Sequence, residues 1–202
     1  MVFTAKEIKA LIISVVVMGI ALGFNDKQEI FSWGFFLNNI AMMIIMVAIA
    51  FIVHQLGHKL VAYLHGFKTE YKTWNLKQLR WWPFNKYWTA KRKEQFPKTF
   101  RFLGKDWTIP GLPIGIIIAF FVSILSNGHL FFLAVGKYDL LIERKGRLGK
   151  RFVEVTDFEE AKIALAGPLA NIALMVLASF FNTYGTFDNF IMINGFLALF
   201  YM

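Results

Sequence analysis

The sequence predicts an all-α polytopic membrane protein with four to five membrane segments, one of them a candidate re-entrant segment, and a small cytoplasmic β-hairpin. Hydrophobic residues make up 57% of the 202 residues, and the mean hydropathy is +0.52. Only 17% of the residues are charged, whereas soluble domains carry roughly a quarter. The apolar residues are gathered into long runs, so one membrane-embedded domain over residues 1–202 is the simplest organisation.

Five apolar runs are candidates for membrane segments. A helix needs about 20 residues to cross the hydrocarbon core. Four of the runs approach this length, and the fifth has only about 13 residues, which is short unless tilting or local thinning of the bilayer compensates. In chain order they are Ile8–Phe24, Phe31–Val53, Ile109–Leu125, Ala161–Phe181 and Phe190–Met202.

The first run follows Lys6 and Lys9, as the apolar part of a signal peptide would. No small-x-small cleavage site follows it, so we expect a retained anchor. Basic residues then fix the orientation, because Lys and Arg concentrate on the cytoplasmic side of membrane proteins. Twelve of the 22 lie between Lys59 and Lys105, and seven lie between Lys137 and Lys162. We therefore expect an integral protein of the cell membrane with a basic cytoplasmic loop over 59–106.

Both basic stretches should be cytoplasmic, yet a single apolar run separates them. Either Ile109–Leu125 enters and leaves on one side, or Leu130–Val135 completes the return as an extended strand; we favour the re-entrant interpretation. Residues 137–160 then contain two short β-like runs around a glycine-bearing turn, which predicts a cytoplasmic hairpin.

The net charge of +9 does not indicate a nucleic-acid-binding protein. The basic residues lie between apolar runs, and no nucleic-acid-binding fold signature accompanies them. Their position favours contact with anionic membrane lipids. The chain has no cysteine, which excludes disulfides and thiolate metal sites.

His54 and His58 form a His-x-x-x-His pair at the end of the second apolar run. Residues four apart share one helix face, so two imidazoles could bind a single Zn²⁺ together with a third protein ligand and water. In His-Glu-x-x-His hydrolases the glutamate is the general base. Gln55 holds that position here, and an amide cannot act as a base near neutral pH.

The alternative for this pair is that two histidines happen to end a membrane helix. Ionisable side chains at membrane depth are costly and usually functional, which favours metal binding. His65 and His129 are isolated in the sequence, so we expect them to be interfacial or structural.

Three separated elements of the chain resemble the site-2 protease family of intramembrane zinc metalloproteases. The first is the histidine motif and the Lys59-Leu60-Val61-Ala62 that follows it. The second is Ala166-Gly167-Pro168-Leu169-Ala170-Asn171, which is similar to the family's Ala-Gly-Pro-x-x-Asn element. The third, residues 194–200, resembles the start of the helix that leads to a Leu-Asp-Gly motif. The opening residues 3–8 and the basic loop resemble archaeal members.

The resemblance implies cleavage of a peptide bond in or near a substrate's transmembrane segment. On that basis His54 and His58 would be zinc ligands, and position 55 would hold the general base. Asn171 would orient the substrate or the reaction intermediate; without the resemblance, an interhelical hydrogen bond is the simpler role. Gly167 and Pro168 would loosen their helix and permit close packing. Residues 130–136 could form a strand that pairs with an extended substrate.

Two departures from the family pattern predict an inactive chain as it stands: Gln55 replaces the expected Glu, and no Leu-Asp-Gly occurs before Met202. In the family that Asp is the third zinc ligand. Asp188 precedes the fifth apolar run and matches none of the family's motifs, so we do not expect it to replace that ligand. Three interpretations remain open: a protease whose chain has been altered, a non-catalytic relative that binds transmembrane segments, and a transporter or lipid-binding membrane protein.

Overall fold

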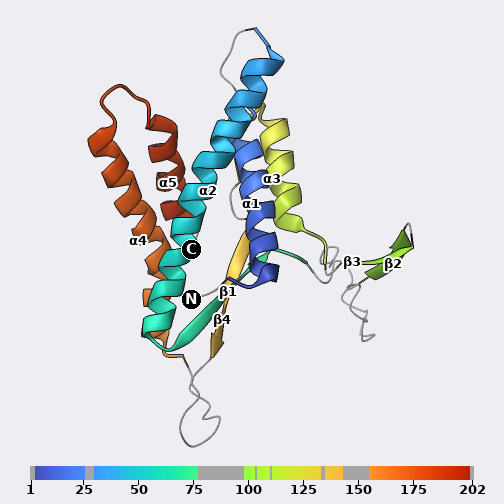
Figure 1. Cartoon of the computed structure of the whole chain (residues 1–202), viewed down its shortest axis with the longest axis vertical. Coiled ribbons are helices and arrows are strands. Elements are labelled where there is room, and N and C mark those ends of the chain that lie inside the picture. Colours follow the sequence, from blue (N-terminus) through green and yellow to red (C-terminus); the bar gives the residue numbers. More distant parts are fainter. Residues whose placement is uncertain are drawn as a thin grey trace, which may run out of the picture.

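Five helices and two small antiparallel sheets make up the described part of the computed structural model (Figure 1). The structure describes residues 3–25, 30–76, 98–102, 104–109, 111–132, 135–142 and 155–200. The helices are α1 (Ala5–Gly23), α2 (Trp33–Leu64), α3 (Ile114–Leu125), α4 (Asp157–Phe181) and α5 (Asp188–Phe200). The strands are β1 (Phe67–Thr73), β2 (Lys98–Phe102), β3 (Lys105–Ile109) and β4 (Gly136–Ile142).

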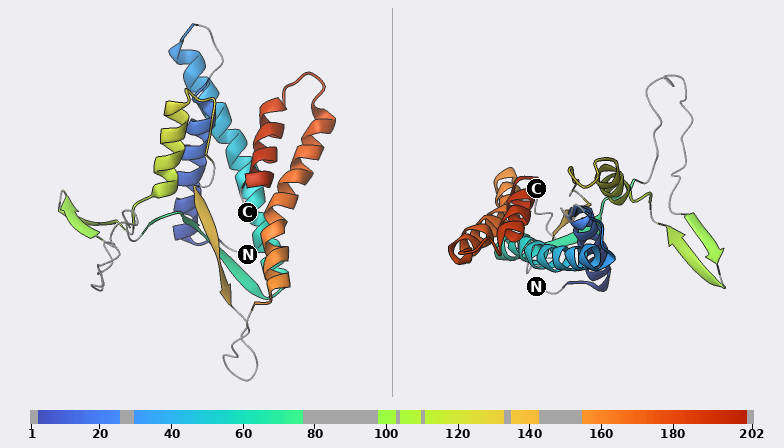
Figure 2. Two further views of the ribbon diagram at one scale, coloured as in Figure 1. Left: turned by 180° about the vertical axis from the view of Figure 1, so that it is seen from behind. Right: turned by 90° about the horizontal axis from the view of Figure 1, so that it is seen from above.

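Helix α2 is the central element. Seen from two further directions, it lies between α1 and α3 on one side and α4 and α5 on the other (Figure 2). The buried apolar core follows α2, where Val47, Ala50 and Phe51 are inaccessible or nearly so. Met18 of α1 and Ile193 of α5 belong to the same core. The histidine helix therefore touches both halves of the molecule.

Local sequence explains where α1 and α4 begin. Thr4 and Thr156 are N-cap residues, and each accepts a hydrogen bond from the backbone N–H three residues later. Glu7 and Glu159, at those later positions, bond back to the N-cap backbone and complete a capping box. This reciprocal arrangement satisfies two of the unpaired backbone donors at a helix start.

Strand β4 pairs with β1, antiparallel, with Tyr138 opposite Tyr71. The first strand of the predicted hairpin over 137–160 is present as β4, and its described partner is a strand that precedes it by about 70 residues, as the pairing of Phe67 with Ile142 shows. Residues 143–154, including the predicted second strand, lie outside the described residues, and 157–160 belong to α4. The predicted loop over 59–106 contains the end of α2 and strands β1 and β2, while residues 77–97 lie outside the described part.

Three predicted boundaries also need correction. Helix α2 continues past Val53 to Leu64, so the histidines lie within it. The third apolar run becomes helical only at Ile114, after Pro113; its 12 residues span about 18 Å, too short for a hydrocarbon core of about 30 Å. Residues 130–132 are not a strand, since β4 starts at Gly136, and 133–134 lie outside the described residues.

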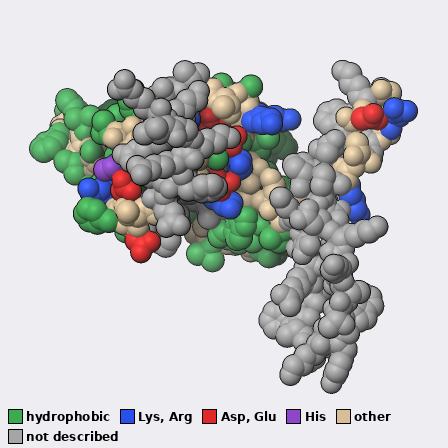
Figure 3. All heavy atoms as spheres, turned by 90° about the horizontal axis from the view of Figure 1, so that it is seen from below, with side chains coloured by type: hydrophobic (Ala, Val, Ile, Leu, Met, Phe, Trp, Pro, Cys, Tyr) green, Lys and Arg blue, Asp and Glu red, His purple; other side chains and the backbone are tan. Residues whose placement is uncertain are grey.

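Two of the described helices, α2 and α4, are long and apolar enough to cross a membrane. Both carry a lengthwise stripe of exposed apolar side chains at helical spacing, which water would not favour. The end of the molecule where α2 finishes and α4 begins instead shows acidic and basic side chains (Figure 3). This distribution favours association with a membrane. The stripe residues are Met42, Ile45, Ile49, Ile52, Leu56 and Leu60 on α2, and Leu165, Leu169, Ile172 and Val176 on α4.

Candidate metal centre

His54 and His58 lie one turn apart on the face of α2 that packs against α4, and both side chains are fully buried. Their Nε2 atoms approach each other to 3.0 Å. Two nitrogens that share one tetrahedral zinc ion, at zinc–nitrogen distances of about 2.0–2.1 Å, lie about 3.3–3.4 Å apart. The observed pair would need to open by only a few tenths of an ångström to hold one ion.

The orientation of His58 is fixed by a backbone group of α4. Its Nδ1 lies 2.7 Å from the carbonyl oxygen of Ile163. A carbonyl only accepts hydrogen bonds, so Nδ1 must carry the proton and donate it. In the neutral ring, Nε2 of His58 is then an unprotonated lone pair directed at His54. The ring of Tyr138 from β4 packs on His58, with ring centroids 4.4 Å apart and planes 32° apart.

A side chain, not a backbone carbonyl, supports His54. Nδ1 of His54 lies 3.2 Å from Nδ2 of Asn171 on α4, and Asn171 is fully buried. The ring of Phe51, one turn earlier on α2, stacks parallel to His54. Asn171 was expected to orient substrate or intermediate; the structure places it behind a histidine ring, where it can orient the imidazole.

Glycine is required where α4 crosses the pair. A Cβ added at Gly167 would overlap Nε2 of His58 and lie 2.7 Å from Nε2 of His54. The missing side chain thus lets both nitrogens lie against the backbone of α4. Gly57, between the histidines, is equally constrained, because its Cβ would lie 2.6 Å from the carbonyl oxygen of Ala166. Pro168 lacks a backbone donor and so loosens α4 at this crossing.

These residues fit a metal ion as half of its coordination shell. Two imidazole nitrogens converge, and each ring is supported through its other nitrogen, as metal-binding histidines commonly are. Among the described residues, no group of three or more His, Cys, Asp or Glu side chains gathers there. The remaining coordination positions would fall to water or to groups outside the described residues.

Gln55 is 2% exposed, and its Nε2 has no hydrogen-bond partner among the described residues. A buried amide donor without a partner costs free energy, which marks this position as one adapted to a ligand or to a different side chain. No ionisable group stands where the resemblance requires a base.

The other candidates lie away from the pair. Asp188, at the start of α5, accepts a hydrogen bond from Asn182. Asn182 follows Asn171 by 11 residues and therefore lies about 16 Å further along α4. His65 lies at the C-terminal end of α2, and its Nδ1 is 4.0 Å from a carboxylate oxygen of Glu159 in the first turn of α4. His129 is exposed after α3.

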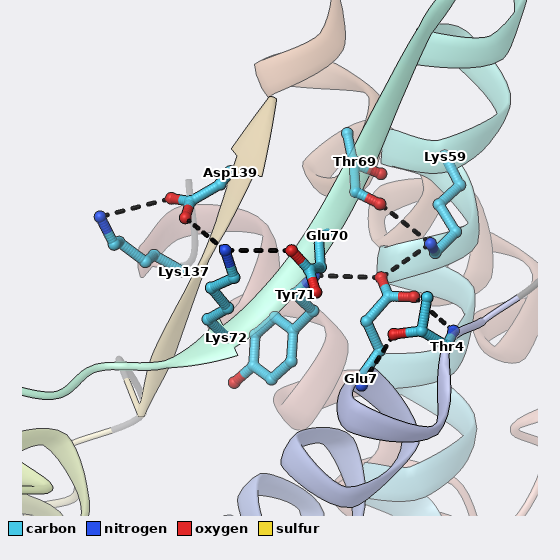
Figure 4. Close-up of polar contacts among 9 residues, drawn as sticks. All are labelled: Thr4, Glu7, Lys59, Thr69, Glu70, Tyr71, Lys72, Lys137 and Asp139. Carbon is cyan, nitrogen blue, oxygen red and sulfur yellow. Dashed lines mark hydrogen bonds and ion pairs between the residues drawn. The ribbon is translucent and has the colours of Figure 1, made fainter. Parts of the chain in front are cut away.

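A buried ionic network anchors the strands next to the site (Figure 4). Oε1 of Glu7 accepts from Lys59 Nζ at 2.8 Å and from the backbone N–H of Tyr71 at 3.1 Å. Lys59 also donates to the carbonyl of Thr69, and Oε2 of Glu7 accepts from the N–H of Thr4. The network thus joins α1, the turn of α2 after His58, and β1. Since β1 pairs with β4, it also fixes the strand that carries Tyr138.

Charged side chains on the outer strand surface form a second, more exposed cluster. Lys72 lies 3.0 Å from Glu70 and 3.2 Å from Asp139, and Lys137 also contacts Asp139. Partial burial raises the pKa of the Asp139 carboxyl, but the hydrogen bonds and positive charges of Lys72 and Lys137 outweigh it and hold that pKa below its usual range. The same carboxylates raise the pKa of Lys72.

Sequence reasoning missed two contributors to the site. Tyr138 belonged to a predicted strand, but nothing in the sequence identifies the helix on which that strand packs. The Ile163 carbonyl is a backbone group, so no side-chain pattern could reveal it.

No family model, no curated protein and no solved structure matches this chain. Its function therefore has to be argued from the chemistry of the site.

Proposed function

We propose that this chain is an intramembrane zinc metalloprotease of the site-2 protease type that, with glutamine at position 55, binds zinc and transmembrane segments without cutting them. One observation carries the proposal: the Nε2 atoms of His54 and His58 converge at 3.0 Å beside a glycine where any side chain would collide with both rings. Both rings are supported from behind by α4.

The chemistry follows from the residues present. His54 and His58 would hold the zinc ion, which when bound would polarise a peptide carbonyl and acidify water. A Glu at 55 would supply the general base, whereas Gln55 only donates and accepts hydrogen bonds. The charged end of the molecule, which is rich in basic residues in the sequence, would lie at the cytoplasmic face. The site would then lie within the membrane, near that face.

Zinc binding is the first test. The full chain in detergent is titrated with zinc in competition with a chromogenic chelator, and we expect one zinc ion per chain. His54→Ala and His58→Ala should each weaken binding by more than the roughly 10–100-fold that loss of a supporting residue costs. His65→Ala is the matched control and should bind as the original chain does. Failure to bind zinc, or an equal loss in His65→Ala, would refute the metal site.

Hydrolysis is the second test. The sequence carries neither the base nor the Leu-Asp-Gly of the family pattern, so the test variant combines Gln55→Glu with an added C-terminal helix that carries Leu-Asp-Gly. The restored base is worth about 10²–10⁴-fold in rate. Single-span substrates in liposomes should then be cleaved in a zinc-dependent manner, and His54→Ala in the same background should abolish cleavage.

Gln55 specifically favours one competing function, a binder of transmembrane segments that stays non-catalytic even when position 55 carries a glutamate. Its buried Nε2 lacks a described partner and could donate to a bound peptide. If the variant with Gln55→Glu and the added helix binds zinc stoichiometrically but leaves a panel of single-span substrates intact, this function replaces proteolysis. If neither form holds zinc, a transporter or lipid-binding role becomes the better account.

A further inference from the structure

The two histidines are supported in chemically different ways. His58 donates from Nδ1 to the Ile163 carbonyl, an acceptor that cannot change its role, and Tyr138 packs on the ring. His54 faces the carboxamide of Asn171, which presents a donor on one side and an acceptor on the other. The proton position of His58 is therefore fixed, whereas that of His54 can change.

Without a metal ion, the hydrogen bonds settle into one consistent pattern. Nε2 of His58 is a lone pair, so the 3.0 Å contact requires Nε2 of His54 to carry a proton and donate it. Nδ1 of His54 is then an acceptor and receives a hydrogen bond from Nδ2 of Asn171 at 3.2 Å. Oδ1 of Asn171 has no described partner in this arrangement.

A zinc ion would require the opposite arrangement at His54. Both Nε2 atoms must offer lone pairs to the metal, so the proton of the neutral His54 ring must move from Nε2 to Nδ1. Nδ1 then becomes a donor and needs an acceptor. A half-turn of the Asn171 carboxamide would supply Oδ1, the atom that otherwise has no described partner.

We propose that Asn171 is a positioning residue that reverses its carboxamide to switch His54 between a metal-free form protonated on Nε2 and a zinc-binding form protonated on Nδ1. The inference rests on the proposed zinc site. Zinc binding is then coupled to two changes: one proton moves between the two nitrogens of His54, and the carboxamide of Asn171 turns. The protonation of His58 does not change.

Nitrogen NMR of the intact protein tests this directly, because the chain has only four histidines and selective ¹⁵N-histidine labelling gives few signals. His65→Gln and His129→Gln variants identify the two outside the site. At a pH where the rings are neutral and zinc is absent, His54 should carry its proton on Nε2 and His58 on Nδ1. Zinc should move the His54 proton to Nδ1 and leave that of His58 in place.

Variants of Asn171 sharpen the test. Asn171→Asp offers only acceptor oxygens, so His54 should carry its proton on Nδ1 even without zinc, and zinc should bind up to about 10-fold more tightly. Asn171→Leu removes both roles and should weaken zinc binding by about 10–100-fold. Asn194→Leu is the control: this buried amide of α5 donates to Phe190 of its own helix, and zinc affinity should change by less than about twofold.

Two results would overturn the inference: an Nδ1 proton on His54 in the zinc-free original chain, or zinc binding that leaves the His54 proton on Nε2. The zinc-free spectra need no metal, so they test the inference even if Asn171→Asp fails to fold. Absence of zinc binding in every variant would instead refute the proposed function, while the zinc-free proton positions would still be measured.

Discussion

Gly167→Ala is the substitution that most directly tests the geometry of the proposed metal centre. The new methyl carbon would overlap Nε2 of His58 and lie 2.7 Å from Nε2 of His54. Side-chain carbons essentially never approach closer than 3.0 Å, so the His54 ring alone would have to retreat by at least 3.0 − 2.7 = 0.3 Å. Metal sites tolerate distance errors of about 0.2 Å. The methyl group would therefore push both rings away from their present positions.

The expected magnitudes differ for binding and for stability. Zinc affinity should fall by about 100-fold or more, at or beyond the upper end of what loss of a supporting residue costs. Overpacking costs about 1–3 kcal/mol, and Ala regains about 1 kcal/mol over Gly in a helix, so the metal-free protein should lose only about 0–2 kcal/mol of unfolding free energy.

The assay is the competitive zinc titration, accompanied by thermal unfolding in the absence of zinc. Gly195→Ala in α5 is the matched control, because its methyl would meet only Met175 Sδ at an ordinary 3.5 Å. That variant should bind zinc normally and unfold at the same or a slightly higher temperature. Zinc binding by Gly167→Ala within about threefold of the original chain would refute the placement of the ion between α2 and α4.

Two further perturbations test the anchoring of the strands. Glu7→Gln or Lys59→Met should each lower the unfolding free energy by about 3–5 kcal/mol, because each leaves a buried charge without its counter-ion. The double variant should lose clearly less unfolding free energy than the two single variants lose together, which a double-mutant cycle measured by thermal unfolding would show. Simple additivity of the two losses would contradict the pairing. Asp139→Asn tests the outer cluster. The pKa of Asp139 is lower in the folded protein than in the unfolded chain, so its carboxylate stabilises the folded state at pH values above the unfolded pKa. This stabilisation is lost as the pH falls through the folded pKa. Below about pH 4 the free energy of unfolding of the original chain should therefore fall by about 0.2–1 kcal/mol, and that of the Asn variant should not. If unfolding free energy depends on pH identically in both proteins, Asp139 makes no such contribution.

Local patterns predicted the helices well. The apolar runs around α1, α2, α4 and α5 are visible in the sequence, and the four-residue spacing of His54 and His58 places them on one face. The second apolar run was expected to end at Val53, because the polar His54, Gln55, His58 and Lys59 follow it. In the structure the charge of Lys59 is buried against Glu7, 52 residues away, so the helix continues. No local pattern could supply that partner.

The sheet and the support of the site depend on long-range contacts. The strand that carries Tyr138 was expected, but its described pairing with β1 was not, because no local pattern links two runs so far apart in the sequence. The contact of the Ile163 carbonyl with His58, and the close approach of both histidine rings to Gly167, depend on how α4 crosses α2. Of the side chains around the histidines, Asn171 was singled out only through a family resemblance, and its contact with His54 came from the structure.

The contacts from α4 to the histidines also bear on how the site is made during synthesis. Ile163 follows His58 by 105 residues, and Asn171 follows His54 by 117. A nascent chain exposes its histidine pair well before α4 has been translated, and domains assemble as their parts emerge. During that interval the pair has helical spacing but neither a support for its rings nor a glycine beside it. Metal loading would thus be a late step in biogenesis, and a polypeptide arrested before α4 would leave its histidines available to water, lipid or chaperone.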